Sequence, residues 1–175
     1  VAVGAEAGVN ITSGVENVLL GQSAGAQHTV TSYIISIGGG SANTTMATGA
    51  NGTIAIGQTA LMRGVLGAGP STAVGYLAGQ YATGSYNTFV GNAAGRGATT
   101  SAPYSSGQYN TALGNEALEN FTTANDCVAI GFRTGESITT GGSNVAIGAY
   151  AYDAATTVSG NTAIGFRAGG AHTTG

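Results

Sequence analysis

Chemically reactive side chains are scarce in this 175-residue chain. It contains two histidines (His28 and His172), one cysteine (Cys127), seven acidic residues, four arginines and no lysine. A nucleophilic cysteine needs a base beside it, and no histidine lies near Cys127 in the sequence, so a buried thiol is favoured. The histidines lie near opposite ends of the chain, which argues against a shared metal ion. The absence of lysine excludes a Schiff base and a Walker-type phosphate site.

One pair of acidic residues could suggest catalysis. Glu116 and Glu119 lie three positions apart, and glycoside hydrolysis uses two carboxyl groups held at a fixed separation across a cleft. However, the positions equivalent to Glu116 in the repeat described below hold Arg133, Tyr150 and Leu77. Such variety is typical of an exposed corner. We therefore expect no enzyme, no cofactor and no metal site; a depolymerase acting on surface glycans is the enzymatic alternative.

The composition excludes further classes of partner. Only 6% of the residues are charged, against about 25% in an ordinary globular domain. The formal net charge is −3, and the four arginines are scattered, so the basic patch of a nucleic-acid-binding protein is missing. No apolar run reaches the ~18 residues of a membrane-spanning helix. We expect no nucleic-acid partner and no insertion into a membrane.

A short repeat, anchored by a glycine in each copy, runs through the chain. The interval between successive anchors is seventeen in five cases of nine, and it is longest between Gly91 and Gly114. Glycine at this density is unfavourable in a helix by about 1 kcal/mol per position. The sequence therefore predicts a β-solenoid with two short strands and two turns per coil, and ten coils at about 4.8 Å make a rod about 48 Å long. The anchors are Gly4, Gly21, Gly38, Gly57, Gly75, Gly91, Gly114, Gly131, Gly148 and Gly165.

The residues before each anchor alternate as a strand requires. Counting from the anchor, position −3 is always β-branched, position −1 is always aliphatic, and position −2 is alanine in seven of ten copies. Positions −3 and −1 point to one face of a strand and −2 to the other. Asparagine occurs at −4 in five copies, where we expect it to form the turn entering the strand.

The alanine face predicts association with other chains. A face that met water would carry polar residues, whereas small residues let another chain approach closely. We expect the aliphatic positions to fill the coil and the alanines to pack against sister subunits, with three-fold closure as the simplest arrangement. The expected subunit interface consists of Ala55, Ala73, Ala112, Ala129, Ala146 and Ala163.

The longest interval between anchors, from Gly91 to Gly114, predicts a surface loop. Insertions in solenoids form loops, often on the binding face, and exposed tyrosine and arginine are frequent contact residues. We expect the contact loop to include Arg96, Pro103, Tyr104 and Tyr109. Aromatic residues at position +1 (Tyr76, Phe132 and Phe166) predict either a ridge for sugar rings or packing between subunits.

The repeated phrases resemble known fibres. Asn144-Val145-Ala146-Ile147-Gly148 and residues 161–169 are similar to the head repeats of trimeric autotransporter adhesins (YadA-like heads) and to repeats of bacteriophage tail and capsid fibres. The phrase at 110–118, followed by Thr122-Thr123, is closer to the phage fibres. The resemblance implies an all-β, left-handed parallel β-roll that is trimeric, lies outside the cell and attaches to a cell surface.

These observations favour one function over its alternatives. We expect residues 1–175 to be a single β-solenoid domain, a segment of a longer phage fibre on the virion surface. Its expected partners are two further copies, other fibre domains and a glycan or protein receptor on the host. The main alternative is the head of a bacterial trimeric adhesin, which flanking sequence would distinguish. Ice binding is a weaker alternative because the threonines do not form a regular Thr-x-Thr face.

Overall fold

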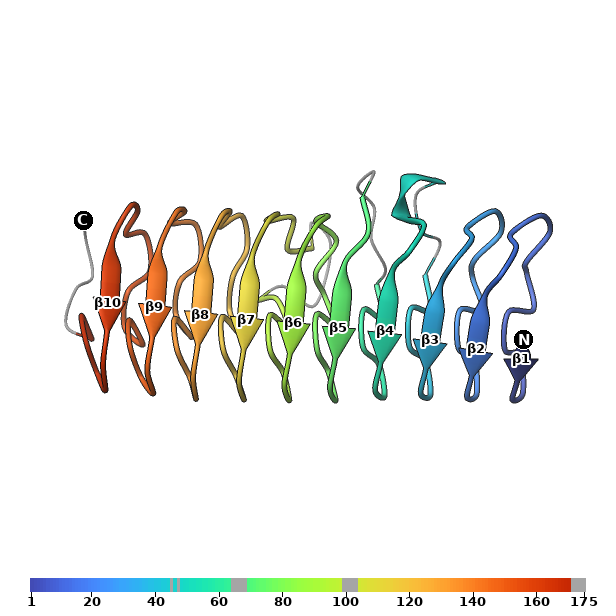
Figure 1. Cartoon of the computed structure of the whole chain (residues 1–175), viewed down its shortest axis with the longest axis horizontal. Coiled ribbons are helices and arrows are strands. Elements are labelled where there is room, and N and C mark those ends of the chain that lie inside the picture. The colour runs from blue at the N-terminus through green and yellow to red at the C-terminus, as the bar shows by residue number, and fades with distance from the viewer. Residues whose placement is uncertain (45, 47, 64–68, 99–103, 171–175) are drawn as a thin grey trace.

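Ten short parallel strands form one continuous sheet in the computed structural model of the chain (Figure 1). The structure describes residues 1–175 except 45, 47, 64–68, 99–103 and 171–175. The strands are β1 (Ala2–Val3), β2 (Val18–Leu20), β3 (Ile35–Ile37), β4 (Ile54–Ile56), β5 (Thr72–Val74), β6 (Thr88–Val90), β7 (Thr111–Leu113), β8 (Val128–Ile130), β9 (Val145–Ile147) and β10 (Thr162–Ile164).

The strands follow one another in sequence order, so the chain is a β-solenoid, as predicted. Ten strands are joined by nine coils, slightly fewer than the ten coils expected. Figure 1 shows the strands side by side along a straight row, with the two chain ends at opposite ends of that row. One 3-10 helix, η1 (Thr48–Ala50), lies in the connection between β3 and β4. No helix among the described residues has the length and apolar character needed to span a membrane.

Equivalent residues of neighbouring coils pair directly. Ala129 of β8 is aligned with Ala146 of β9, and Ile130 is aligned with Ile147. The same register holds across the insertion, because Phe89 of β6 is aligned with Ala112 of β7. The repeat therefore sets the register, and extra residues are accommodated in the turns.

The predicted second strand of each coil is absent from the described residues. The Thr-Thr segments form bends, although they still bond from coil to coil. The backbone N–H of Thr122 donates to the Thr139 carbonyl at 2.8 Å, and the Thr139 N–H donates to the Thr156 carbonyl at 2.9 Å. The Thr122 and Thr139 hydroxyls donate to the same two carbonyls. Hydrogen bonding between coils thus continues where the backbone is too bent to be a strand.

Left-handed backbone conformations close each coil. The anchor glycines have φ between 124° and 140°, a region that L-residues avoid. A Cβ on Gly57, for example, would meet the carbonyl of Gly75 in the next coil. The second residue after every anchor is also left-handed, even where it is Glu116 (φ 56°) or Tyr150 (φ 60°). Stacking of identical coils imposes this conformation on residues that rarely adopt it alone.

The structure reverses the predicted orientation of the strands. The six alanines expected at a subunit interface are 0–6% exposed in the single chain, so they face the interior of the coil. Positions −3 and −1 face outward and are partly or fully exposed, as at Val3 (61%), Leu113 (46%) and Ile164 (67%). The prediction that the aliphatic positions fill the coil was wrong.

The narrow interior explains the reversal. The coil also encloses the residues at +3, +4 and +7, such as Ala78, Leu118 and Ile138. The space left between these residues and the sheet is narrow, so the side chain at position −2 is generally no larger than a methyl group. Phe89 fits at −2 because the facing residues are Gly79 and Gly95, whose Cβ atoms would collide with its ring. Branched residues therefore remain on the outer face, where the extended backbone favours them.

Candidate functional site

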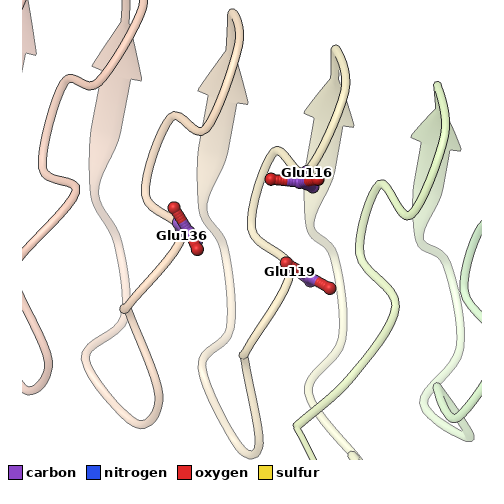
Figure 2. Close-up of side chains that lie close together, drawn as sticks. All are labelled: Glu116, Glu119 and Glu136. Carbon is purple, nitrogen blue, oxygen red and sulfur yellow. The ribbon is translucent and has the colours of Figure 1, made fainter.

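Three glutamates meet on the turns that follow β7 and β8. Figure 2 shows Glu116 and Glu119 on one coil and Glu136 on the next. Oxygen atoms from the three carboxylates lie within 4.8 Å of one another. The sequence suggested a possible relation between Glu116 and Glu119, but it did not indicate that Glu136 joins them. The sequence did contain a signal for this contact, because Glu119 and Glu136 both occupy the fifth position after an anchor glycine.

Two arginines form ion pairs with this acidic cluster. Arg133 Nε binds Glu116 Oε2 and lies 3.6 Å from Glu136 Oε2. Arg96 Nη1 binds Glu119 Oε1 at 2.9 Å. Burial raises the pKa of the Glu136 carboxyl, while Arg133 opposes that rise. The guanidinium groups occupy the positions from which a cation would be bound, so the geometry is that of an ion-pair network joining adjacent coils.

The predicted contact loop does not form one cluster. The Tyr104 ring stacks on Tyr81 with centroids 6.4 Å apart, and the Arg96 guanidinium lies 5.8 Å from the Tyr81 ring. Tyr109 belongs to a different turn, where it is 55% exposed and stacks on Tyr86 at 5.2 Å with the rings nearly parallel. Pro103 lies outside the described residues. Only Arg96 and Tyr104 are brought together, through Tyr81.

A second aromatic group lies at the corner of the last three coils. Phe132 contacts Tyr150 edge to face at 5.2 Å, and Tyr150 contacts Phe166 at 6.1 Å. Phe132 and Phe166 are 42% and 71% exposed. Arg167 lies over the rings of both Tyr150 and Phe166. The +1 positions predicted to be aromatic contacts are therefore exposed, and Tyr150 at +2 links two of them.

His28 and Cys127 are both inside the coil. His28 is fully buried, and desolvation lowers its pKa to about 4, opposed only by a polar interaction with the Ala42 backbone. Burial raises the pKa of the Cys127 thiol, so this group is a weak nucleophile at neutral pH. Neither residue lines the cavity described next. His172 lies outside the described residues.

A cavity of about 460 Å³ opens on the turns of three successive coils. The sequence pattern did not indicate a site at any of the described residues that line it: Gln27, Asn43, Thr44, Met62 and Arg63. These residues occupy the fifth or sixth position after the anchors Gly21, Gly38 and Gly57. The two intervals that end at Gly57 and Gly75 are longer than the usual seventeen. This irregularity is the sequence signal that could have indicated the cavity.

Arg63 connects this cavity to the contact loop. Its guanidinium lies 5.2 Å from the ring centroid of Tyr104, which in turn stacks on Tyr81. Two stacked tyrosine rings therefore lie between the guanidinium groups of Arg63 and Arg96. The arrangement offers hydrogen-bond donors, aromatic faces and one cation without a carboxylate partner among the described residues.

The chain matches no protein-family model, no curated protein and no solved structure in comparisons with each of these three groups.

Proposed function

We propose that this chain is a rod-shaped segment of a bacteriophage fibre on the virion surface, which supports attachment of the particle to a host cell. It assembles as a homotrimer of left-handed β-rolls. The resemblance of residues 110–118 and 161–169 to fibre repeats supports this assignment. The straight solenoid also fits a fibre, because coils stacked in one direction make a long and narrow molecule.

The outer face of the sheet is the observation that carries the proposal. Positions −3 and −1 form two rows of Val, Ile, Leu and Thr that run the length of the sheet without a charged residue. Large apolar patches are uncommon on the surface of a monomer, and parallel sheets are usually covered on both faces. The inner face is covered by the chain's own turns, whereas the outer face is not.

Two further copies of the same chain are the proposed cover. A uniform, uncharged row is complementary to itself, so identical chains match along their full length. The interface is therefore the aliphatic row and not the alanine row that the sequence predicted. Three-fold closure follows the resemblance to trimeric fibres, and it lets each chain contribute the same surface.

The assembly is tested by the native mass in solution. The wild-type chain is expected to have three times the 16.9 kDa of one chain. Replacing two outward residues (Ile130→Lys with Ile147→Lys) places charges in the interface and is expected to produce a smaller species. Thr140→Lys, on an exposed bend away from the sheet, is the control and is expected to keep the trimer. A soluble wild-type monomer would contradict the proposed assembly.

Attachment is tested separately with cells. The fluorescently labelled chain is expected to adsorb to the envelopes of susceptible bacteria within a panel of strains. Adsorption only to animal cells or extracellular matrix would instead indicate the adhesin alternative. Adsorption to neither would contradict a role in attachment.

A further inference from the structure

The cavity beside Arg63 has the size and position of a ligand site. Its volume of about 460 Å³ lies within the roughly 300–1,000 Å³ range typical of small-molecule pockets. Gln27, Thr44 and Arg63 each occupy the sixth position after an anchor glycine, so the lining comes in register from three coils. Because these residues lie on the turns, the cavity stays open when the outer sheet face is covered by other copies.

Three buried polar atoms in residues that line the cavity have no hydrogen-bond partner among the described residues. The atoms are Asn43 Oδ1, Thr44 Oγ1 and Arg63 Nε. They are three of the seven such side-chain atoms in the described part of the chain, so this one cavity holds a large share. A buried polar group left without a hydrogen bond is unfavourable by about 1–3 kcal/mol. Three of the lining residues therefore keep hydrogen-bonding capacity that the described protein groups do not use.

The charge in the cavity is a single positive one. Arg96 and Arg133 each bind a glutamate, whereas no described carboxylate forms an ion pair with Arg63. None of the described residues that line the cavity is acidic. Packing on the Tyr104 ring at 5.2 Å holds the Arg63 guanidinium in place. A ligand with one negative charge would balance this site.

We propose that this cavity binds a carboxylated sugar residue, of the uronic or sialic acid type, within an acidic glycan. The planar guanidinium of Arg63 matches a carboxylate in geometry and charge. The amide of Asn43 and the hydroxyl of Thr44 complement sugar hydroxyl groups, and Met62 provides an apolar contact for the C–H face of the ring. This inference specifies the receptor of the attachment role proposed above, and it rests on that role for the source of the glycan.

Direct binding to the full chain tests the inference. Isothermal titration with a galacturonic acid tetrasaccharide is compared with titration of its methyl ester, which lacks the charge. The free acid is expected to bind, and the ester is expected to bind at least about tenfold more weakly. Sialyllactose and lactose form a second such pair, which distinguishes a sialic acid from a uronic acid as the preferred source. Equal binding of acid and ester, or no binding of either acid, would overturn the inference.

Matched variants locate the site. Arg63→Gln is expected to weaken binding of the acid at least about tenfold, and Arg63→Lys is expected to restore part of it because the charge remains without the planar fork. Arg167→Gln is the control, because Arg167 is another arginine without a described carboxylate partner. Thermal melting verifies that each variant is folded. Equal losses in the two glutamine variants, or displacement of the sugar by inorganic phosphate at equal concentration, would refute the assignment.

The outcomes separate this inference from the proposed function. If the chain is trimeric and adsorbs to bacteria while Arg63→Gln binds the acid normally, the cavity assignment fails and the fibre role stands. If the chain binds the acid through Arg63 but neither assembles nor adsorbs to cells, the fibre role fails and the sugar site stands.

Discussion

Several of the asparagines at position −4 join their own coil to the next. Asn110 Nδ2 donates to the Ala124 carbonyl at 2.8 Å, and Asn110 Oδ1 accepts from the Cys127 N–H at 3.0 Å. Asn144 makes the equivalent pair of bonds to Val158 and Asn161. These asparagines were predicted to form the turn that enters the strand, and that prediction was incomplete. The residue with the left-handed backbone is the one before the asparagine, such as Tyr109 or Ser143. The asparagine side chain instead forms hydrogen bonds to the neighbouring coil.

Cys127 occupies position −4, where other coils have asparagine, and its thiol forms a weaker form of the same hydrogen bond to the next coil. Its Sγ lies 3.5 Å from the Gly141 carbonyl, in the same place along the repeat as the Asn110 bond to Ala124. We predict that Cys127→Asn raises the free energy of unfolding by about 1 kcal/mol, because a true amide replaces a weak thiol donor. Cys127→Ala, which removes the donor, should lower it. Urea denaturation at one fixed protein concentration measures both, and an Asn variant no more stable than the Ala variant would refute the comparison.

His28 makes the stability of the rod depend on pH. It occupies the seventh position after its anchor, where other coils place Ile11, Phe121 and Ile138. The pKa is about 4 in the folded chain, against 6.5 ordinarily. Between these values the unfolded chain binds a proton that the folded chain does not, so stability falls as the pH drops from 6.5 towards 4. The full effect is about 3 kcal/mol.

The matched variant for this prediction is His28→Ile. It restores the residue type of the same position in two other coils, and it is expected to be more stable than wild type at every pH. The difference in unfolding free energy between variant and wild type should widen as the pH falls from 6.5 to about 4. A difference that stays constant across this range would show that His28 does not titrate in the interior.

At the scale of elements, the asparagine bonds and the strands form one continuous set of contacts between coils. We predict that Asn144→Ala lowers the free energy of unfolding by about 2–4 kcal/mol, because it leaves the buried Val158 carbonyl and the partly buried Asn161 N–H without their partner. Asn161→Ala is the control, since among the described residues its side chain bonds only to Ser159 within its own turn, and it is partly exposed. It should have a much smaller effect, and equal losses would contradict the role of bonds between coils.

The repeat identified the strands and their register but not their orientation. Anchor glycines and β-branched residues placed the ten observed strands correctly, because both reflect local backbone preferences, whereas the second strand predicted in each coil is absent from the described residues. Which face is buried depends on the width of the coil, and that width is set by turn residues such as Leu118 and Ile138 that contact the sheet from the far side. The alternating pattern shows that each strand has two different faces, but it does not show which face is buried. The more apolar aliphatic face was therefore predicted to lie in the interior.

The candidate sites were harder to predict because they join residues from separate coils. Glu136 meets Glu119 only when the coils stack, and the cavity beside Arg63 arises where coils of unequal length adjoin. The sequence marked the long interval before Gly114 as the contact region. The structure places Arg96 and Tyr104 of that interval beside Tyr81 and leaves Tyr109 elsewhere.

At the scale of the whole molecule, protein groups alone offset most of the charge at the glutamate cluster, where two arginines face three glutamates. We predict that EDTA or millimolar Ca²⁺ changes the melting temperature of the wild-type chain by less than about 1 °C, because Arg133 and Arg96 already form ion pairs with the carboxylates. Arg133→Gln should lower the melting temperature, and added Ca²⁺ should restore part of the loss. Arg167→Gln is the control and should respond to neither. A large effect of EDTA on the wild type would show that a bound cation is required.

Strand contacts within the rod occur only between neighbours in the sequence. A duplicated or deleted stretch one repeat long would therefore create a junction of the same kind as those already present. Recombination between such similar stretches of a gene would lengthen or shorten the encoded rod by whole steps, while the remaining coils keep their geometry. The length of such a rod is thus a heritable quantity that varies independently of the side chains that each coil displays.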